Sequence, residues 1–262
     1  MISIIVSENS EACCTVTDEQ IVQIKRLIDA KYKAGQCIED FVIQNVSIIY
    51  SSEVSGGYKE SDRYELISGD SITYSEEILG FNFNVSPFAF FQVNTNVFEK
   101  MLNEISAFLN INKDTVVFDI CCGTGAIGIC LSRMAKKVLG FELVEAAVEN
   151  AKKNVELNKD KIEPGKCQFF AGRAEYTLPE AAKAESEKDS TIVGIVDPPR
   201  GGLHRDVLKA LRCTKGLNRL VYVSCNAVSQ MRDMQHLCYT TEKRRKAPPF
   251  KPINCIGADL FP

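Results

Sequence analysis

The chain has 262 residues, of which 45% are hydrophobic and 25% charged, which excludes a disordered chain or a coiled coil as an overall description. No apolar run approaches the roughly 18–20 residues of a membrane-spanning helix, and the first residues lack the basic segment and long apolar core of a secretory signal. The 11 cysteines show no C-x-x-C spacing, and with only 2 histidines we expect no metal centre or iron–sulfur cluster. Free thiols indicate a reducing, intracellular compartment, which we expect to be cytoplasmic or nuclear rather than mitochondrial.

Charge divides the chain into two parts. Residues 1–85 carry 6 basic and 14 acidic side chains, whereas residues 86–262 carry 25 basic and 20 acidic ones. The net charge of the whole chain is −3. We therefore predict an N-terminal α+β or β-rich module over 1–85 and a second domain over 86–262. The positive balance of the second domain could face a polyanion, although solvated surface lysines explain it equally well.

In the first module, apolar residues at helical spacing predict a helix over 17–34, which Thr17 and Asp18 can cap. Segments rich in β-branched and aromatic residues then predict short strands. These strands cover residues 41–50, 64–67, 71–74 and 81–85, with a turn at Gly56–Gly57.

After Ser86–Pro87, strand-like and helix-like segments alternate. The predicted strands are 116–120, 137–141, 167–171, 192–197, 219–224 and 254–258. The predicted helices are 126–134, 144–158, 207–212 and 228–237, and the acidic segment 179–190 is a helix or a loop. This alternation predicts parallel βαβ units in an α/β fold, a doubly wound Rossmann-like sheet whose site lies at the carboxyl ends of the strands.

The first of these strands leads into a glycine-rich turn in which Gly123, Gly125 and Gly128 fit the G-x-G-x-x-G fingerprint of dinucleotide sites. The second strand ends at Glu142, 19 residues after Gly123, where an acid can accept hydrogen bonds from both hydroxyls of an adenosine ribose. The pattern predicts an adenosine-containing cofactor and does not distinguish a dinucleotide from S-adenosylmethionine. A glycine-bearing turn without a ligand is the structural alternative.

Two further motifs follow the later strands. Asp197-Pro-Pro-Arg200 cannot continue a strand, because the prolines hold the chain rigidly outside the sheet. Asp197 can accept a hydrogen bond from a planar ring and Arg200 can pair with a phosphate, although a stiff surface turn is the simpler interpretation. Cys225, in Ser-Cys-Asn, lies at the same edge before a helix, whose N-terminus favours a thiolate. We interpret Cys225 as a candidate nucleophile, although most cysteines are inert packing residues.

Together with Phe90-Phe91-Gln92-Val93-Asn94, these motifs resemble the RNA uracil-5-methyltransferase family, and most closely the animal tRNA (uracil-5-)-methyltransferases that act on the T-loop uridine. The resemblance covers about residues 79–262. It implies an S-adenosylmethionine-dependent methyltransferase fold, S-adenosyl-L-methionine as the cofactor, a tRNA substrate and 5-methyluridine as the product. We expect no metal ion, no membrane partner and a monomer.

The resemblance also implies roles for individual positions. The positions that match cofactor contacts of the family are Gln92, Cys121, Gly123 and Glu142. Asp197 matches an acid shared by the cofactor and base sites, and Cys225 matches the catalytic nucleophile. The chemistry agrees, because a thiolate that adds to C6 of uracil makes C5 nucleophilic and later leaves well. The target uridine must leave its stack, and Phe88, Phe90 and Phe91 could support it, although core packing is their more common role.

The end of the sequence departs from the family pattern. In the family, the segment that corresponds to Asp259–Pro262 precedes a histidine–x–glutamate motif, whose glutamate removes the C5 proton, and a last strand. This sequence stops before both, so we assign no residue as that base and expect a C-terminally truncated domain whose last strand is missing. Ala227 stands where the family usually has proline. The basic run Lys243–Lys246 could track RNA phosphates, although a solvated loop explains it as well.

Three other interpretations stay open. A relative without the base could bind RNA without turnover, as an RNA-binding or chaperone-like protein. An RNA cytosine-5 methyltransferase would use the same thiol addition. An NAD-dependent dehydrogenase would explain the glycine motif and Glu142, but it leaves the motifs around Asp197 and Cys225 without a role. Exchange of Cys225 for serine tests the RNA-binding alternative, and binding measurements with the two cofactors test the dehydrogenase. The Asp-Pro-Pro-Arg and Ser-Cys-Asn motifs resemble the uracil enzymes more than the cytosine enzymes.

Overall fold

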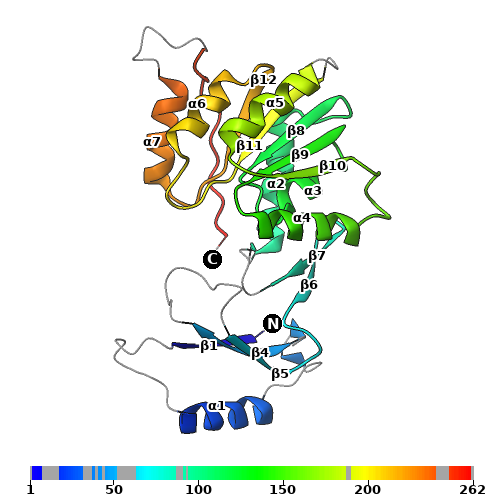
Figure 1. Ribbon diagram of the computed structural model, residues 1–262, viewed down its shortest axis with the longest axis vertical. Helices are drawn as coiled ribbons and strands as arrows, with labels where there is room; N and C mark the ends of the chain where they lie inside the picture. The colour runs from blue at the N-terminus through cyan, green and yellow to red at the C-terminus, as the bar shows by residue number, and fades with distance from the viewer. Residues whose placement is uncertain are drawn as a thin grey trace. The chain divides into compact units, whose positions relative to one another are not determined.

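The computed structural model describes residues 2–7, 18–31, 37–38, 41–42, 45–51, 63–86, 91–92, 94–186, 190–239 and 248–260. The chain forms two compact units, which are shown in Figure 1. The first unit comprises Met1–Glu76 and Asn84–Phe91, and the second comprises Glu77–Phe83 and Gln92–Pro262. The domain boundary predicted between residues 85 and 86 stays a prediction.

The first unit is built on a small mixed sheet. Its strands are β1 (Ile2–Ser7), β4 (Val46–Ser51) and β5 (Arg63–Ser68), with β1 parallel and β5 antiparallel to β4. The predicted helix is present as α1 (Asp18–Lys31), and Lys25 of this helix forms an ion pair of 2.5 Å with Glu65 of β5. The segment predicted as one strand over 41–50 is divided between β3 (Phe41–Val42), which pairs with β2 (Cys37–Ile38), and β4.

One strand of this region is shifted from its predicted position. The strand expected over 71–74 is wrong, because the Ser71 hydroxyl accepts a hydrogen bond from the backbone N–H of Thr73 and closes a turn. The strand β6 (Tyr74–Ile78) begins after it and pairs with β7 (Phe81–Val85), as predicted for residues 81–85. The turn predicted at Gly56–Gly57 lies outside the described residues.

The second unit contains a five-stranded sheet in the order β10-β9-β8-β11-β12. Its strands are β8 (Thr115–Ile120), β9 (Lys137–Glu142), β10 (Cys167–Ala171), β11 (Thr191–Val196) and β12 (Leu217–Tyr222). All neighbouring pairs are parallel. The first strand, β8, is central and buried along its whole length, and the chain winds outward from it in both directions. The predicted doubly wound Rossmann-like α/β fold is therefore confirmed, and its switch point lies between β8 and β11.

Helices cover both faces of this sheet (Figure 1). One face carries α2 (Thr95–Leu109), α3 (Ala126–Leu131) and α4 (Glu145–Leu157), and the other carries α5 (Ala174–Ser186), α6 (Arg205–Cys213) and α7 (Ala227–Cys238). Helix α2 was not predicted from the sequence, although Asn94 caps it and its apolar residues recur at helical spacing. No helix in the described part of the chain combines the length and apolar character that crossing a membrane requires.

The last described segment, residues 248–260, contains no strand, so the strand predicted over 254–258 is wrong. The backbone N–H of Phe250 bonds to the carbonyl of Leu237, and Ile253 is 92% exposed. A strand needs the backbone of a neighbour as its partner, and none of the described strands pairs with this segment.

Candidate functional site

The glycine-rich turn after β8 has three residues in the left-handed region, with φ of 61° at Cys121, 52° at Gly123 and 82° at Gly125. The backbone N–H groups of Cys121 and Cys122 donate hydrogen bonds of 2.8 and 3.2 Å to the carbonyl of Phe141 at the end of β9. The turn is thus anchored to the neighbouring strand. Cys121 is a non-glycine residue at positive φ, a strained conformation that is often found at functional sites.

The two glycines of this turn serve different purposes. A Cβ atom on Gly125 would lie 2.8 Å from the ring of Phe169, so close packing excludes a side chain there. A Cβ atom on Gly123 would meet nothing within 4 Å among the described residues. The space above Gly123 is therefore open, and a ligand can approach the backbone at this point.

Glu142 at the end of β9 is bound by backbone groups through both carboxylate oxygens. Oε2 accepts a hydrogen bond of 3.0 Å from the N–H of Gly123, and Oε1 accepts one of 2.9 Å from the N–H of Val144. A carboxylate oxygen has two lone pairs, so each can accept a second hydrogen bond from a ligand hydroxyl. The next residues, Leu143 and Val144, are 66% and 55% exposed and form an apolar surface beside Glu142, which was not predicted from the sequence. The sequence does contain a signal for this surface, because two apolar residues directly follow the acid at the end of the strand.

Asp119 lies behind the turn and is completely buried. Its Oδ2 accepts a hydrogen bond of 2.9 Å from the N–H of Gly128, whereas Oδ1 has no partner within the described part of the chain. Burial, aided by the nearby carboxylates of Asp197 and Glu142 and opposed by the hydrogen bond from Gly128, raises the pKa of Asp119 to about 7. An unpaired buried acceptor is costly, so this oxygen marks a position where a donor from a ligand or a water would be favourable.

The acid after β11 lies at the same edge of the sheet. The N–H of Asp197 donates a hydrogen bond of 3.2 Å to the carbonyl of Ile120, the last residue of β8. Burial raises the pKa of Asp197 to about 6. Burial, followed by the charges of Glu142, Asp119 and Asp197, raises the pKa of the Cys121 thiol to about 12. The structure therefore gathers three carboxyl groups around the glycine-rich turn.

Cys225 is an exposed free thiol in the loop between β12 and α7. The N–H of Val223 bonds to the carbonyl of Val196 at 2.8 Å, so this loop leaves the sheet beside the segment that begins with Asp197. Asn226 caps α7 through its bond from the N–H of Val228, and its Nδ2 donates a hydrogen bond of 3.0 Å to the carbonyl of Arg200. The predicted Asp-Pro-Pro-Arg and Ser-Cys-Asn motifs are thus in direct contact.

In the part of the chain that it describes, the structure does not connect the remaining predicted residues to this site. Gln92 lies three residues before α2, and none of the described hydrogen bonds joins it to the other candidate residues. Phe88, Phe90 and the basic run Lys243–Lys246 lie outside the described residues.

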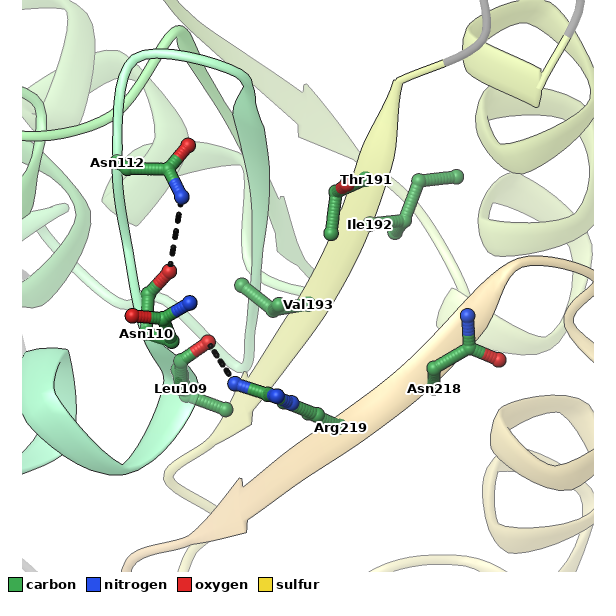
Figure 2. A pocket seen from close by; sticks show the side chains of 8 residues that line it. All are labelled: Leu109, Asn110, Asn112, Thr191, Ile192, Val193, Asn218 and Arg219. Carbon is green, nitrogen blue, oxygen red and sulfur yellow. Dashed lines mark hydrogen bonds between the residues drawn. The ribbon is translucent and has the colours of Figure 1, made fainter.

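A pocket of about 320 Å³ lies elsewhere, at the opposite edge of the sheet (Figure 2). The end of α2 and the first residues of β11 and β12 line it. The guanidinium of Arg219 donates a hydrogen bond of 3.2 Å to the carbonyl of Leu109 across it. The candidate site residues described above are separate from this pocket, because they lie at the carboxyl ends of the strands, whereas the pocket lies at the amino ends of β11 and β12.

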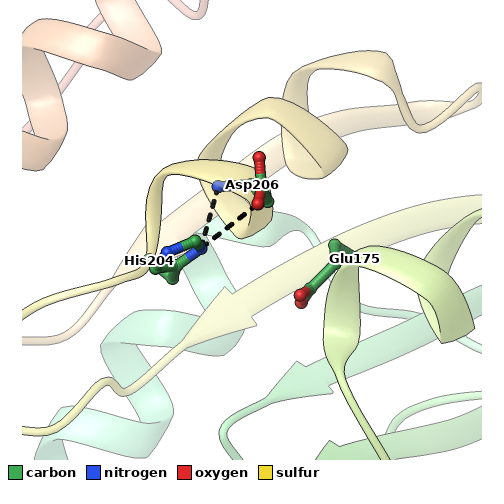
Figure 3. Close-up of side chains that lie close together, drawn as sticks. All are labelled: Glu175, His204 and Asp206. Atoms are coloured by element: carbon green, nitrogen blue, oxygen red, sulfur yellow. Dashed lines mark hydrogen bonds and ion pairs between the residues drawn. The ribbon is translucent and has the colours of Figure 1, made fainter.

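A cluster of possible metal ligands, Glu175, His204 and Asp206, lies at the starts of α5 and α6 (Figure 3). His204 caps α6, since its Nδ1 accepts a hydrogen bond of 3.4 Å from the N–H of Asp206. His204 and Asp206 are exposed, and capping already engages the Nδ1 atom. The cap accounts for His204 and Asp206, and Glu175 already pairs with the guanidinium of Arg173 at 3.7 Å.

Comparisons with known proteins give the relatives of this chain. The family model described as tRNA (Uracil-5-)-methyltransferase matches residues 71–250. The human tRNA (uracil-5-)-methyltransferase homolog A is 40% identical over 198 residues, which are 76% of this chain and 31% of that protein. Homolog B of Danio rerio is 40% identical over 206 residues, 78% of this chain and 42% of that protein. The chain thus spans well under half the length of these two relatives.

Solved structures share the fold. The tRNA (uracil-54, C5)-methyltransferase of Pyrococcus abyssi, in complex with S-adenosyl-L-homocysteine, matches with a TM-score of 0.54 and 26% identity, over 78% of this chain and 47% of that chain. The tRNA m1G37 methyltransferase of M. jannaschii matches with a TM-score of 0.51 and 13% identity, over 91% of this chain and 65% of that chain, which supports the fold alone.

Proposed function

Because the chain belongs to the tRNA (uracil-5-)-methyltransferase family, we propose that it methylates C5 of the T-loop uridine of tRNA through a covalent bond between Cys225 and C6 of the base. The observation that carries this proposal is the position of the Cys225 thiol. It is exposed at the carboxyl edge of the sheet, in a loop bonded to the loop that follows Asp197. A nucleophile for a base in a pocket needs this combination of access and a fixed backbone.

The residues at the glycine-rich turn fit S-adenosylmethionine. The open space above Gly123 admits a ligand to the backbone, and Glu142 keeps a free lone pair on each oxygen for the two ribose hydroxyls. Leu143 and Val144 offer an apolar surface for the adenine beside this acid. Gln92 and Cys121 are further proposed contacts. When bound, S-adenosylmethionine supplies the electrophilic methyl group that C5 receives.

Cys225 makes C5 reactive by a reversible addition. Its thiolate forms a bond from Sγ to C6, and the electron pair of the C5–C6 double bond moves into the C4 carbonyl as an enolate, which makes C5 nucleophilic. After C5 gains the methyl group, loss of the C5 proton returns an electron pair to the ring. The double bond forms again and the Sγ–C6 bond breaks, so the thiolate is regenerated. We assign no residue of this chain to removal of the C5 proton.

Asp197 orients the base in this scheme. The pKa of about 6 leaves its carboxyl group mainly ionised at neutral pH, so it can accept a hydrogen bond from the N3–H of uracil. Cytosine has no hydrogen on N3, so the same carboxylate disfavours it. This preference separates the proposed uridine substrate from the cytosine-5 alternative.

The decisive experiment uses a T-arm RNA hairpin whose target position carries 5-fluorouridine, incubated with the chain and S-adenosylmethionine. Fluorine cannot leave as a proton does, so the Cys225 adduct accumulates after methylation, and intact-mass spectrometry detects it. The Cys225→Ser variant should form no adduct, whereas Cys213→Ser, which alters another exposed cysteine, should form it normally. An adduct in Cys225→Ser contradicts the proposal, as does RNA binding without an adduct in the unaltered chain.

A further inference from the structure

Asp233 on α7 is a buried carboxylate outside the proposed site. Its Oδ2 accepts two short hydrogen bonds, one of 2.6 Å from the N–H of Leu203 and one of 2.7 Å from the hydroxyl of Tyr222. Its Oδ1 pairs with the guanidinium of Arg232 at 3.3 Å. Burying a carboxylate stabilises a fold only when it is paired and hydrogen-bonded this fully.

The two donors to Oδ2 belong to the segments that carry the proposed reacting groups. Leu203 closes the loop that starts at Asp197, and Tyr222 is the last residue of β12, three residues before Cys225. One oxygen atom of α7 therefore joins the loop that follows β11 to the last residue of β12.

The loop after β11 also packs closely against side chains of α7. Gly202 has a φ of 78°, and a Cβ atom there would lie 2.6 Å from both Oδ2 of Asp233 and Nη2 of Arg232. The same Nη2 donates a hydrogen bond of 2.5 Å to the carbonyl of Gly201. Together with the bond from Asn226 to Arg200, these contacts fix three of the four residues from 200 to 203 by hydrogen bonds to residues 226–233.

From this geometry we propose that Asp233 is a positioning residue, which holds the Asp197 loop and the Cys225 loop in register; the inference rests on the proposed function. Attack of Sγ on C6 requires the thiolate to lie at a fixed distance from a base that the Asp197 loop orients. A displacement of about 1 Å between the two loops would slow the addition on the order of 100-fold. Cofactor contacts at Gly123 and Glu142 belong to other strands, and the N–H of Asp197 itself is bonded to Ile120 of β8, so cofactor binding should not change.

Three variants test the proposal in the full chain. Asp233→Leu removes both acceptor oxygens and should slow adduct formation with the 5-fluorouridine hairpin at least 30-fold, with the Kd for S-adenosyl-L-homocysteine unchanged within 2-fold. Asp233→Asn keeps one acceptor oxygen for Leu203 and Tyr222 and should recover most of the rate. Tyr222→Phe removes one of the two bonds and should give an intermediate rate. If Asp233→Leu does not fold, the other two variants decide the question.

A matched control separates positioning from stability. Asn158→Leu removes two partly buried hydrogen bonds between the C-cap of α4 and Asn82 of β7, far along the chain from both loops, so it should lower the Tm and leave the rate of adduct formation unchanged. A wild-type rate in Asp233→Leu overturns the proposal. Equal losses of adduct formation and cofactor binding also overturn it, because they indicate a general structural defect.

A further readout does not depend on the proposed function. Hydrogen exchange in Asp233→Leu, or in Tyr222→Phe if that variant alone folds, should be faster in peptides covering residues 198–204 and 222–226 and unchanged in β8 and β9. If the unaltered chain forms no adduct, the proposed function fails, and this exchange pattern alone decides whether Asp233 holds the two loops. Unchanged exchange in both peptides overturns the inference.

Discussion

The backbone N–H of Gly123 donates a hydrogen bond of 3.0 Å to Oε2 of Glu142. This bond joins the glycine-rich turn after β8 to the end of β9, and parallel pairing of these strands brings the two residues together. The same carboxylate therefore shapes the turn and, in the proposed function, binds the ribose. Structure and ligand binding should be coupled at this residue.

Exchange of Glu142 for glutamine tests this coupling. The amide group can accept with its oxygen only, so its NH₂ group must face the N–H of either Gly123 or Val144. We expect the Kd for S-adenosyl-L-homocysteine, measured by calorimetry, to rise at least 10-fold, with a loss of about 1–2 kcal/mol in unfolding free energy. Glu145→Gln, an exposed glutamate in the first turn of α4, is the control and should behave as wild type. An unchanged Kd in Glu142→Gln would count against a role in cofactor binding.

The two glycines of the turn should respond differently to alanine. Gly125→Ala places a methyl group 2.8 Å from the ring of Phe169 at a φ of 82°, so we expect a loss of about 2–4 kcal/mol in unfolding free energy. Gly123→Ala meets open space and should lose only about 1–2 kcal/mol from its left-handed backbone. Its methyl group fills the proposed ligand space, so cofactor binding should fall at least 10-fold. Thermal melts and calorimetry measure both effects, and tight binding by Gly123→Ala would exclude this approach of the ligand.

Thiol reactivity should follow burial. Burial raises the pKa of Cys121 to about 12 and that of Cys167 to about 11, so neither is a thiolate near neutral pH. Peptide mapping after a short exposure to iodoacetamide should therefore find alkylation first among the exposed cysteines of the described chain. These are Cys213, Cys225 and Cys255. Added T-arm RNA should protect Cys225 alone, and alkylation of Cys121 as fast as Cys225 would contradict this order.

The stability of the chain should depend on the proton held by Asp119. Its folded pKa of about 7 lies above the value of about 3.9 in an unfolded chain, because burial disfavours the carboxylate. Protonation therefore stabilises the folded state fully below pH ~4, and this contribution is lost as the pH rises through about 7. Asp119→Asn keeps an acceptor for the N–H of Gly128 and cannot titrate.

Denaturant unfolding at several pH values measures this effect. From pH 4 to 7.5, the unfolding free energy of the wild type should fall relative to Asp119→Asn by about 1–4 kcal/mol. Asp114→Asn, which changes an exposed acid just before β8, should run parallel to the wild type. Parallel curves for wild type and Asp119→Asn would show that Asp119 does not titrate in this way.

Much of the second unit follows from local sequence patterns. The strand over residues 167–171 has its predicted bounds, and the other strands of the sheet differ by one or two residues at their ends. Helix α5 was less clear, since the acidic segment predicted over 179–190 as a helix or loop begins as a helix at Ala174 and contains Pro179 within it. Segment 254–258 has the composition of a strand, but a strand also needs a hydrogen-bonding partner, which local composition does not reveal.

Local patterns in the sequence specify the α/β alternation, the glycine-rich turn and the motifs that identify the family, because periodicity, glycine conformation and motif chemistry are local properties of the chain. The tertiary structure decided which of these residues act together. Strand order places β11 beside β8, although about 75 residues separate them, and so brings Asp197 to the turn at Gly123. The depth of burial left an acceptor of Asp119 without a partner among the described residues, and packing of α7 placed one oxygen of Asp233 between the loop after β11 and the end of β12. Such contacts depend on the order of strands and the direction of side chains, which only the folded chain specifies.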